Sequence, residues 1–190
     1  MSADSASVNL TNHFLIAMPG VDDAIFSKSV VFVCEHSPRG ALGLVINKPA
    51  DMDLKALFEK IDLPLQRADL QASRVFQGGP VQTERGFVLH QPLGSWQSSL
   101  AISDELGMTT SKDILQAVAE GQGPERFFIT LGYAGWSAGQ LESELAQNAW
   151  LTVEADPNVI FNLPAEQRYE AALKLLGIDM AMLSDEAGHA

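Results

Sequence analysis

The sequence predicts an α+β protein that folds as a single domain around a mostly antiparallel β-sheet. Strand-sized stretches outnumber helix-sized ones, and the two kinds do not alternate strictly as they would in a doubly wound parallel fold. The chain of 190 residues has the length of one domain, and no internal repeat, low-complexity block or Pro/Ser-rich linker divides it. Its hydrophobic fraction of 46% is ordinary for a globular protein.

The first predicted elements are strands. His13 to Met18 is an apolar stretch that stops at Pro19-Gly20. Ser29 to His36 alternates around Val and Phe, and Ala41 to Asn47 follows after a short turn. The short connection predicts that these last two strands form an antiparallel hairpin.

The next element is an amphipathic helix over Asp53 to Ile61. Leu54, Leu57, Phe58 and Ile61 follow the spacing i, i+3, i+4, i+7, and Asp51 or Asp53 is placed to cap the helix. Gly and Pro clusters then separate short apolar stretches, and Gly121 and Gly177 mark helix ends. Further strands are expected at Arg74–Gln77, Gly86–His90, Ser99–Ser103, Arg126–Leu131 and Trp150–Ala155, and further helices at Thr110–Glu120, Ser137–Gln147 and Pro164–Leu176.

The two ends of the chain are expected to be tails. Residues 1–11 are small and polar and lack the basic and apolar regions of a secretory signal, so they predict a flexible N-terminal tail. Residues 184–190 are expected to form a C-terminal tail, which leaves residues 12–183 for the domain. No apolar run approaches the ~20 residues that span a bilayer. Cys34 is the only cysteine, which excludes an intramolecular disulfide and predicts a reducing, cytoplasmic location.

The charge balance disfavours direct binding of nucleic acid. The chain carries 12 basic and 24 acidic residues, a net charge of −12. Lys55 and Lys60, the closest pair of basic residues, lie five positions apart. A phosphate-binding surface needs clustered Lys and Arg side chains.

One motif raises the possibility of a serine hydrolase. Gly135-Trp136-Ser137-Ala138-Gly139 has the G-x-S-x-G pattern of a nucleophile elbow, between a predicted strand and a predicted helix. A hydrolase needs an acid and a His base later in the chain, and only His189 follows Ser137. Ser137 and Gln140 also match a capping box, S-x-x-Q. We therefore expect Ser137 to be an N-cap, with a catalytic Ser137 as the alternative.

Two further groups of residues have the composition of a site. Cys34 and His36 are expected to share one strand face with Val30 and Phe32, which predicts a buried thiol beside a hydrogen-bonded His, with a metal or reactive-thiol site as the alternative. Gln77-Gly78-Gly79-Pro80 is expected to be a turn, although glycine-rich turns also bind anions. No metal or cofactor is expected.

Five stretches of the chain form a recognisable series. They are Leu15-Ile16-Ala17-Met18-Pro19, Gly40-Ala41-Leu42-Gly43-Leu44-Val45-Ile46-Asn47-Lys48-Pro49, Phe76-Gln77-Gly78-Gly79-Pro80-Val81, Arg85-Gly86-Phe87-Val88-Leu89-His90 and Leu131-Gly132-Tyr133-Ala134-Gly135-Trp136-Ser137-Ala138-Gly139-Gln140-Leu141. Together they resemble the YqgE/AlgH family, and the match runs in order over about residues 12–190. Tyr169 departs from the pattern, where a Trp is expected. The resemblance implies a bacterial cytoplasmic protein with a bulged, curled α+β sheet and about four flanking helices. It implies no enzymatic activity or cofactor, and the AlgH name implies a role in transcriptional control.

These observations predict a non-catalytic binding or regulatory protein that acts through a protein or small-ligand contact. The alternatives are a transcriptional regulator and a serine hydrolase that uses Ser137. No contact with a membrane is expected. The predicted contact surface contains glycine, aromatic and polar residues: Gln77, Gly78, Gly79, His90, Tyr133 and Trp136.

Overall fold

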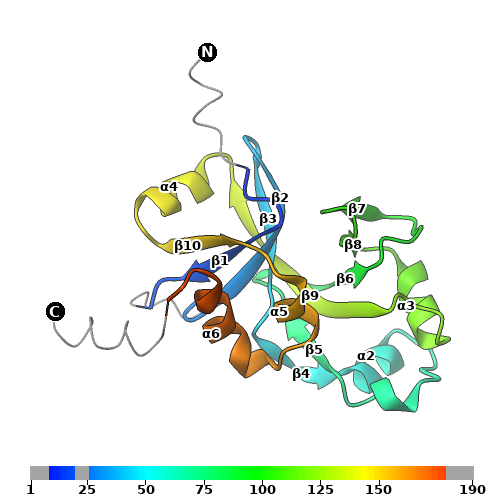
Figure 1. The fold of residues 1–190 in the computed structure, drawn as a ribbon. Helices are drawn as coiled ribbons and strands as arrows, with labels where there is room; N and C mark the ends of the chain where they lie inside the picture. The colour runs from blue at the N-terminus through cyan, green and yellow to red at the C-terminus, as the bar shows by residue number, and fades with distance from the viewer. Residues whose placement is uncertain (1–8, 20–25, 179–190) are drawn as a thin grey trace. The chain divides into compact units, whose positions relative to one another are not determined.

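The computed structural model describes residues 9–19 and 26–178 (Figure 1). The chain divides into two compact units. Unit 1 contains the chain up to Asn47 and from Ala134 onward, and unit 2 contains Lys48–Tyr133. Each unit has its own helices and buried core, and strand β9 (Arg126–Ser137) contributes to both.

The sheet of unit 1 has five strands in the order β10-β1-β2-β3-β9, and every neighbouring pair is antiparallel. The strands are β1 (His13–Ala17), β2 (Val30–Ser37), β3 (Gly40–Val45), the last residues of β9 (Arg126–Ser137) and β10 (Trp150–Glu154). The predicted hairpin is confirmed, because Val31 lies opposite Val45 and Phe32 opposite Leu44.

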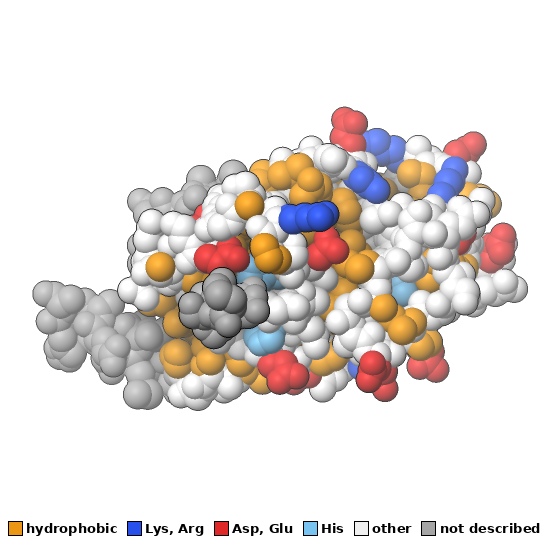
Figure 2. Space-filling view, turned by 90° about the horizontal axis from the view of Figure 1, so that it is seen from above, with side chains coloured by type: hydrophobic (Ala, Val, Ile, Leu, Met, Phe, Trp, Pro, Cys, Tyr) orange, Lys and Arg blue, Asp and Glu red, His pale blue; other side chains and the backbone are white. Residues whose placement is uncertain are grey.

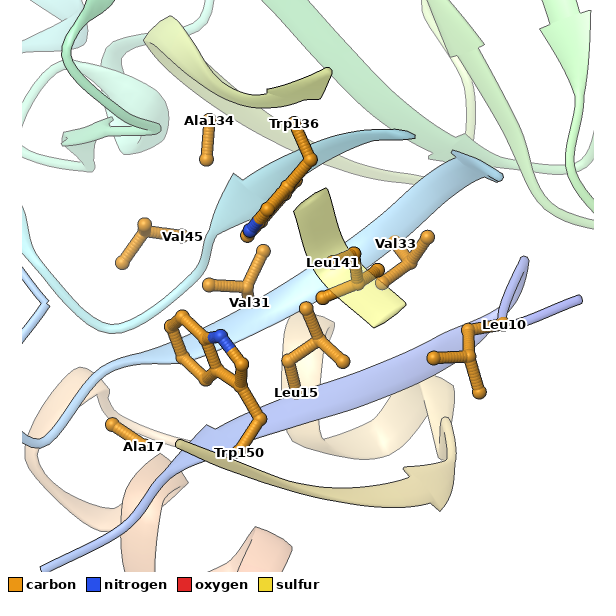
Figure 3. Close-up of a cluster of buried hydrophobic side chains, with 10 residues drawn as sticks. All are labelled: Leu10, Leu15, Ala17, Val31, Val33, Val45, Ala134, Trp136, Leu141 and Trp150. Atoms are coloured by element: carbon orange, nitrogen blue, oxygen red, sulfur yellow. The ribbon is translucent and has the colours of Figure 1, made fainter. Parts of the chain in front are cut away.

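Helix α4 (Gln140–Ala146) covers one face of this sheet, and α5 (Pro157–Phe161) and α6 (Ala165–Leu175) lie on the other (Figure 1). The core under α4 consists of side chains from the strands and the helix (Figure 3). Its members are Leu10, Leu15, Ala17, Val31, Val33, Val45, Ala134, Trp136, Leu141 and Trp150. The two indole rings meet edge to face, with 6.2 Å between their centroids.

Two neighbouring residues of α6 bind it to the backbone at Ile46 and at β1. The Arg168 guanidinium donates to the carbonyl oxygen of Ile46, and its Nε donates to that of Leu163 at 3.0 Å. The hydroxyl of Tyr169 donates to the carbonyl oxygen of Ala17 at 2.7 Å. Tyr169, at the position where the resemblance leads us to expect Trp, therefore makes a buried hydrogen bond to β1.

A bulge in β2 changes which side chains share a face. Val33 lies opposite Gly43, but Glu35 lies opposite Leu42, so Cys34 is an extra residue on β2. His36 therefore lies opposite Ala41, whose side chain packs on the core under α4. The expectation that Cys34 and His36 share a face with Val30 and Phe32 is wrong for His36, because the extra residue reverses the alternation.

The start of the chain corrects the predicted N-terminal tail. Leu10 is 5% exposed and belongs to the core under α4, and the Asn12 amide donates to the Val33 carbonyl at 2.9 Å. The Thr11 hydroxyl accepts from the His36 amide at 3.1 Å. Residues 9–11 are thus part of unit 1, while residues 1–8 and the predicted C-terminal tail at 184–190 lie outside the described residues.

Unit 2 has six strands in the order β4-β5-β9-β6-β8-β7, and only the β5–β9 pair is parallel. The other strands are β4 (Pro49–Asp53), β5 (Arg74–Gln77), β6 (Val81–Gln91), β7 (Ser99–Ala101) and β8 (Gly107–Thr109), and the helices are α2 (Leu54–Lys60), the short 3-10 helix η1 (Ala68–Leu70) and α3 (Lys112–Ala119). Apolar side chains of α2 and α3 pack with Val75, Val88 and Ile129 from the strands.

The predicted helix at residues 53–61 is confirmed together with its cap. The Asp53 carboxylate accepts from the Ala56 amide at 2.9 Å, and Leu54, Leu57 and Phe58 are buried. The N-cap satisfies an amide that has no partner inside the helix.

The predicted fold class, α+β with a mostly antiparallel and bulged sheet, is confirmed. Four short elements were not predicted, β4, η1, β8 and α5, and the described residues contain five α-helices where about four were expected. Within residues 9–19 and 26–178, no helix has the length and apolar content needed to cross a membrane.

We expect Tyr169→Phe to lower the free energy of unfolding by about 1 to 2 kcal/mol, because the buried Ala17 carbonyl loses a hydrogen bond. Tyr133→Phe is the matched control: the Tyr133 ring packs on Phe87 and its hydroxyl has no hydrogen-bond partner among the described residues. Urea unfolding of the three proteins measures the difference. Equal losses in both variants would contradict the assigned role of the Tyr169 hydroxyl.

Candidate functional site

A hollow of about 330 Å³ lies in unit 2 between α2 and the first half of β6. We call it the bulge pocket. Its lining combines apolar side chains with one basic, one acidic and one hydroxyl side chain: Met52, Leu57, Lys60, Ile61, Thr83, Glu84 and Leu131. This volume is at the lower end of the range of small-molecule sites.

The β6 wall of the pocket is a large bulge. Val81 lies opposite Tyr133, but the next paired residue, Gly86, lies opposite Leu131. Gln82 to Arg85 therefore face a single residue of β9, and Gln82 has a φ of +47°. Bulges of this kind redirect side chains and recur beside binding sites. Here the bulge directs Thr83 and Glu84 to the pocket.

Gly132 allows the bulge to pack closely on β9. Its φ is +78°, and a Cβ atom there would lie 2.5 Å from the Gly79 oxygen and 3.2 Å from the Thr83 Cα. Gly78 is equally confined, because a Cβ would lie 2.3 Å from the Gly132 oxygen. These glycines are required for close contact between two backbone segments.

The same contacts define what the Gln77-Gly78-Gly79-Pro80 turn does. The Gln77 amide donates to the Lys48 carbonyl, and the Gly78 amide donates to the Leu131 carbonyl, both at 2.8 Å. Both amides are therefore used in backbone pairing and are not directed at an anion. The turn packs against Gly132, which in turn contacts the backbone of the bulge. Tyr133 pairs with Val81, the residue before the bulge.

A second hollow in unit 2, of about 520 Å³, has a different lining. It is formed by Gln91, Pro92, Glu105, Gly123, Pro124, Glu125 and Arg126. Four of its lining residues are polar or charged, and its apolar lining comes from Pro92, Pro124 and Gly123 and not from aliphatic side chains such as the four of the bulge pocket. The bulge pocket therefore offers the better combination of apolar and polar contacts for a small ligand.

His90, a member of the predicted contact surface, is buried with 0% exposure. Its Nδ1 donates to the Pro92 carbonyl at 3.0 Å, so its Nε2, 2.7 Å from Thr109 Oγ1, accepts from that hydroxyl. Burial lowers the pKa of His90, and the hydrogen bond to Pro92 partly opposes this shift. His90 is a neutral internal residue, so its inclusion in a surface site is corrected.

Trp136 is likewise a core residue and not a surface contact. It is 7% exposed, and its Nε1 donates to Glu144 Oε1 at 3.0 Å. Trp150 Nε1 donates to the same oxygen at 2.8 Å, and Gln140 Nε2 donates to Glu144 Oε2 at 3.0 Å. One carboxylate thus satisfies both indole N–H groups of the core under α4. The sequence analysis missed Glu144, although its spacing from Gln140 on one helix face was a signal.

Ser137 is the last residue of β9, and Gly139 is the N-cap of α4. The Ser137 amide donates to Gln140 Oε1 at 3.0 Å, and the Ser137 hydroxyl donates to the same oxygen at 3.3 Å. Gln140 therefore reaches back as a capping box requires, but Ser137 does not cap a helix amide. The N-cap prediction is wrong because β9 continues through Gly132 and Gly135 and pairs with β3 as far as Ser137.

No imidazole contacts Ser137 among the described residues. The three histidines placed by the structure bond elsewhere: His13 with the Thr11 carbonyl, His36 with Glu142, and His90 with Thr109. His189 lies outside the described residues. An amide oxygen such as Gln140 Oε1 is no general base for a serine nucleophile.

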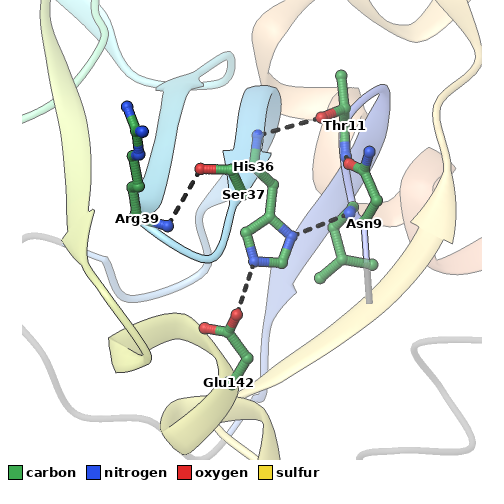
Figure 4. A network of polar contacts seen from close by, with 7 residues as sticks. Asn9, Thr11, His36, Ser37, Arg39 and Glu142 are labelled. Atoms are coloured by element: carbon green, nitrogen blue, oxygen red, sulfur yellow. Dashed lines mark hydrogen bonds and ion pairs between the residues drawn. The ribbon is translucent and has the colours of Figure 1, made fainter. Parts of the chain in front are cut away.

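His36 occupies a polar network beside the core under α4 (Figure 4). The Leu10 amide donates to His36 Nδ1 at 3.0 Å, so Nε2 carries the proton and donates to Glu142 Oε2 at 3.1 Å. Cys34 is buried, and burial, followed by the charge of Glu35, raises its pKa far above the ordinary range. The bulge in β2 separates the side chains of Cys34 and His36. In the described part of the chain, no group of three or more metal-ligating side chains occurs.

Side chains of both charges are exposed. Lys and Arg as well as Asp and Glu side chains occur on the face drawn in Figure 2. Exposed Arg67 forms an ion pair with Asp69.

This architecture is that of a solved α+β structure. The solution structure of the AlgH protein from Pseudomonas aeruginosa matches with a TM-score of 0.80 and 49% identity, over 96% of this chain and 97% of that chain. A crystal structure of a protein from Corynebacterium diphtheriae shares the fold, with a TM-score of 0.68 and 19% identity over 87% of this chain and 86% of that chain.

The chain belongs to the AlgH-like family, whose model, DUF179, matches residues 14–181. The UPF0301 protein of Ralstonia nicotianae is 64% identical over 190 residues, all of both chains. The UPF0301 protein of Chromobacterium violaceum is 58% identical over 184 residues, 97% of this chain and 99% of its own. Neither name states an activity.

We expect Ser137→Ala to change the free energy of unfolding by less than about 0.5 kcal/mol, because its hydroxyl makes only one exposed contact. Gln140→Ala should cost about 1 kcal/mol, because the Ser137 amide loses its acceptor. Urea unfolding measures both. A larger loss in Ser137→Ala than in Gln140→Ala would restore Ser137 as the cap, and fluorophosphonate labelling that disappears in Ser137→Ala would restore it as a nucleophile.

The buried neutral His90 predicts a specific pH dependence. Its pKa in the folded state lies below that in the unfolded chain, so the unfolded state binds the proton first as the pH falls. The contribution to stability is complete above about pH 6.5 and is lost below it, with a limiting slope of about 1.4 kcal/mol per pH unit. Urea unfolding from pH 8 to pH 5 should show a shallower decline for His90→Gln than for the wild type. Parallel curves would contradict this assignment.

Proposed function

We propose that this protein is a non-catalytic binding protein of the cytoplasm and that it binds a small ligand in the bulge pocket. The observation that carries the proposal is the pocket's construction: four apolar side chains form its walls and one side chain of each charge lies at its lining. A concave, mostly apolar surface with a few placed polar groups is typical of ligand sites.

The arrangement of the reactive side chains supports the non-catalytic part of the proposal. Cys34 is buried with a raised pKa, His90 is a buried neutral hydrogen-bonding group, and the Ser137 hydroxyl contacts an amide oxygen. Each of these groups has a structural role in its own unit. The net charge of −12 also favours a ligand other than nucleic acid.

A thermal-shift screen of small metabolites, grouped by charge and size, tests the proposal. A ligand at one hundred times its Kd stabilises a protein by about 2.7 kcal/mol, which gives a clear rise in Tm. Thr83→Trp should abolish the shift, because the indole fills the pocket. Gln122→Trp, at an exposed position of unit 2 that does not line the pocket, should keep it.

Two outcomes would contradict the proposal. Ligands whose shifts survive in Thr83→Trp would place the binding site elsewhere. Chemical conversion of a bound ligand during incubation, followed by mass spectrometry, would show that the protein is an enzyme.

A further inference from the structure

We infer that the ligand of the bulge pocket is a small zwitterion with an apolar side chain, of the chemical class of the apolar α-amino acids. This inference rests on the proposed function, and it adds the charge pattern and the size of the ligand. It follows from the two opposite charges, the aliphatic walls and the volume of the pocket.

The charges lie on different elements. Lys60 is in the last turn of α2, and Glu84 is in the bulge of β6. Neither forms an ion pair with any residue in the described ranges, where the ion pairs are those of His36, Arg67 and Lys174. Both groups are thus available to a ligand.

A ligand with only one charge would be attracted by one of these groups and repelled by the other. A ligand with an ammonium and a carboxylate can pair both, with the carboxylate on Lys60 and the ammonium on Glu84. Charge-assisted hydrogen bonds of this type are stronger than neutral ones. The like charge in the same site disfavours ligands with a single charge and so gives selectivity for a zwitterion.

The apolar walls define the rest of the ligand. Leu57 lies three residues before Lys60, one turn away on the same side of α2, and Ile61 is the C-cap residue of this helix. Met52 and Leu131 add apolar surface from β4 and β9. A volume of about 330 Å³ corresponds to the liquid volume of about eleven water molecules. This suits one amino acid such as leucine, methionine or phenylalanine, and it is small for a longer peptide.

The bulge is held in place without a ligand. Arg85 donates to Gln82 Oε1 at 3.2 Å, and its guanidinium lies 5.5 Å from the centre of the Phe87 ring. Gly132 packs against the backbone of the bulge from the other side. A wall ordered in advance reduces the entropy lost on binding, so a small ligand can bind measurably.

NMR titration of the ¹⁵N-labelled full chain tests the inference. The probes are L-leucine, N-acetyl-L-leucine, which has only the negative charge, and L-leucinamide, which has only the positive charge. We expect L-leucine to shift the amides of Thr83, Glu84 and Ile61, with each analogue binding at least about tenfold more weakly. Tenfold corresponds to about 1.4 kcal/mol.

Charge-removing variants give a second, directional readout. Lys60→Gln and Glu84→Gln should each raise the Kd for L-leucine about tenfold. The two variants should also differ in which single-charge analogue they bind better. Lys60→Gln should favour L-leucinamide, and Glu84→Gln should favour N-acetyl-L-leucine. Lys55→Gln and Glu59→Gln, on exposed positions of α2 outside the pocket lining, are matched controls that should leave the Kd unchanged.

The outcomes separate this inference from the proposed function. Equal affinity for the three probes, or shifts confined to other residues, would overturn the zwitterion. Failure of L-leucine, L-methionine and L-phenylalanine to bind would overturn it too. If a different metabolite raises the Tm of the wild type but not that of Thr83→Trp, the proposed function still stands. A pocket that binds nothing in either experiment would overturn both.

Discussion

Strand β9 is the element on which both units depend, because its backbone is paired in each of them. Its first half pairs with β6 on one edge and with β5 on the other, and its last four residues pair with β3. A buried strand must satisfy its N–H and C=O groups, so its partners must follow its path. At Gly132 the backbone is left-handed, and the bulge of β6 begins opposite this residue. The pocket is therefore a consequence of a backbone constraint in β9.

Polar side chains inside the units serve the backbone and the core. Glu144 accepts from two indoles, His36 connects the Leu10 amide to Glu142, and His90 connects a hydroxyl to a carbonyl. Buried polar groups are costly unless they are paired, and each of these is paired. This explains why residue types that are common in active sites have structural roles here. The proposed ligand contacts, Lys60 and Glu84, are by contrast exposed.

Features whose signal is local in the sequence agree with the structure, whereas features set by a distant strand do not. The helix at α2 was predicted with its cap because four apolar residues and an Asp report a local conformation. The end of β9 was missed because Gly132 and Gly135 look like turn residues, although pairing with β3 keeps that segment extended. His36 was placed on the wrong face because a bulge is a property of two paired strands and not of one. The pocket residues come from four elements, and no spacing along the chain links them.

The sequence by itself determined the fold class, the hairpin of β2 and β3, the cap and apolar face of α2, and the family. These features follow from short-range periodicity, from turn and cap residues and from the order of family-like motifs along one chain. Tertiary structure decided which glycines lie against another backbone, which carboxylate holds the two indoles and where a pocket opens. Those outcomes depend on contacts between residues far apart in the chain, since register, bulges and burial are set by the partner strand as much as by the residue itself.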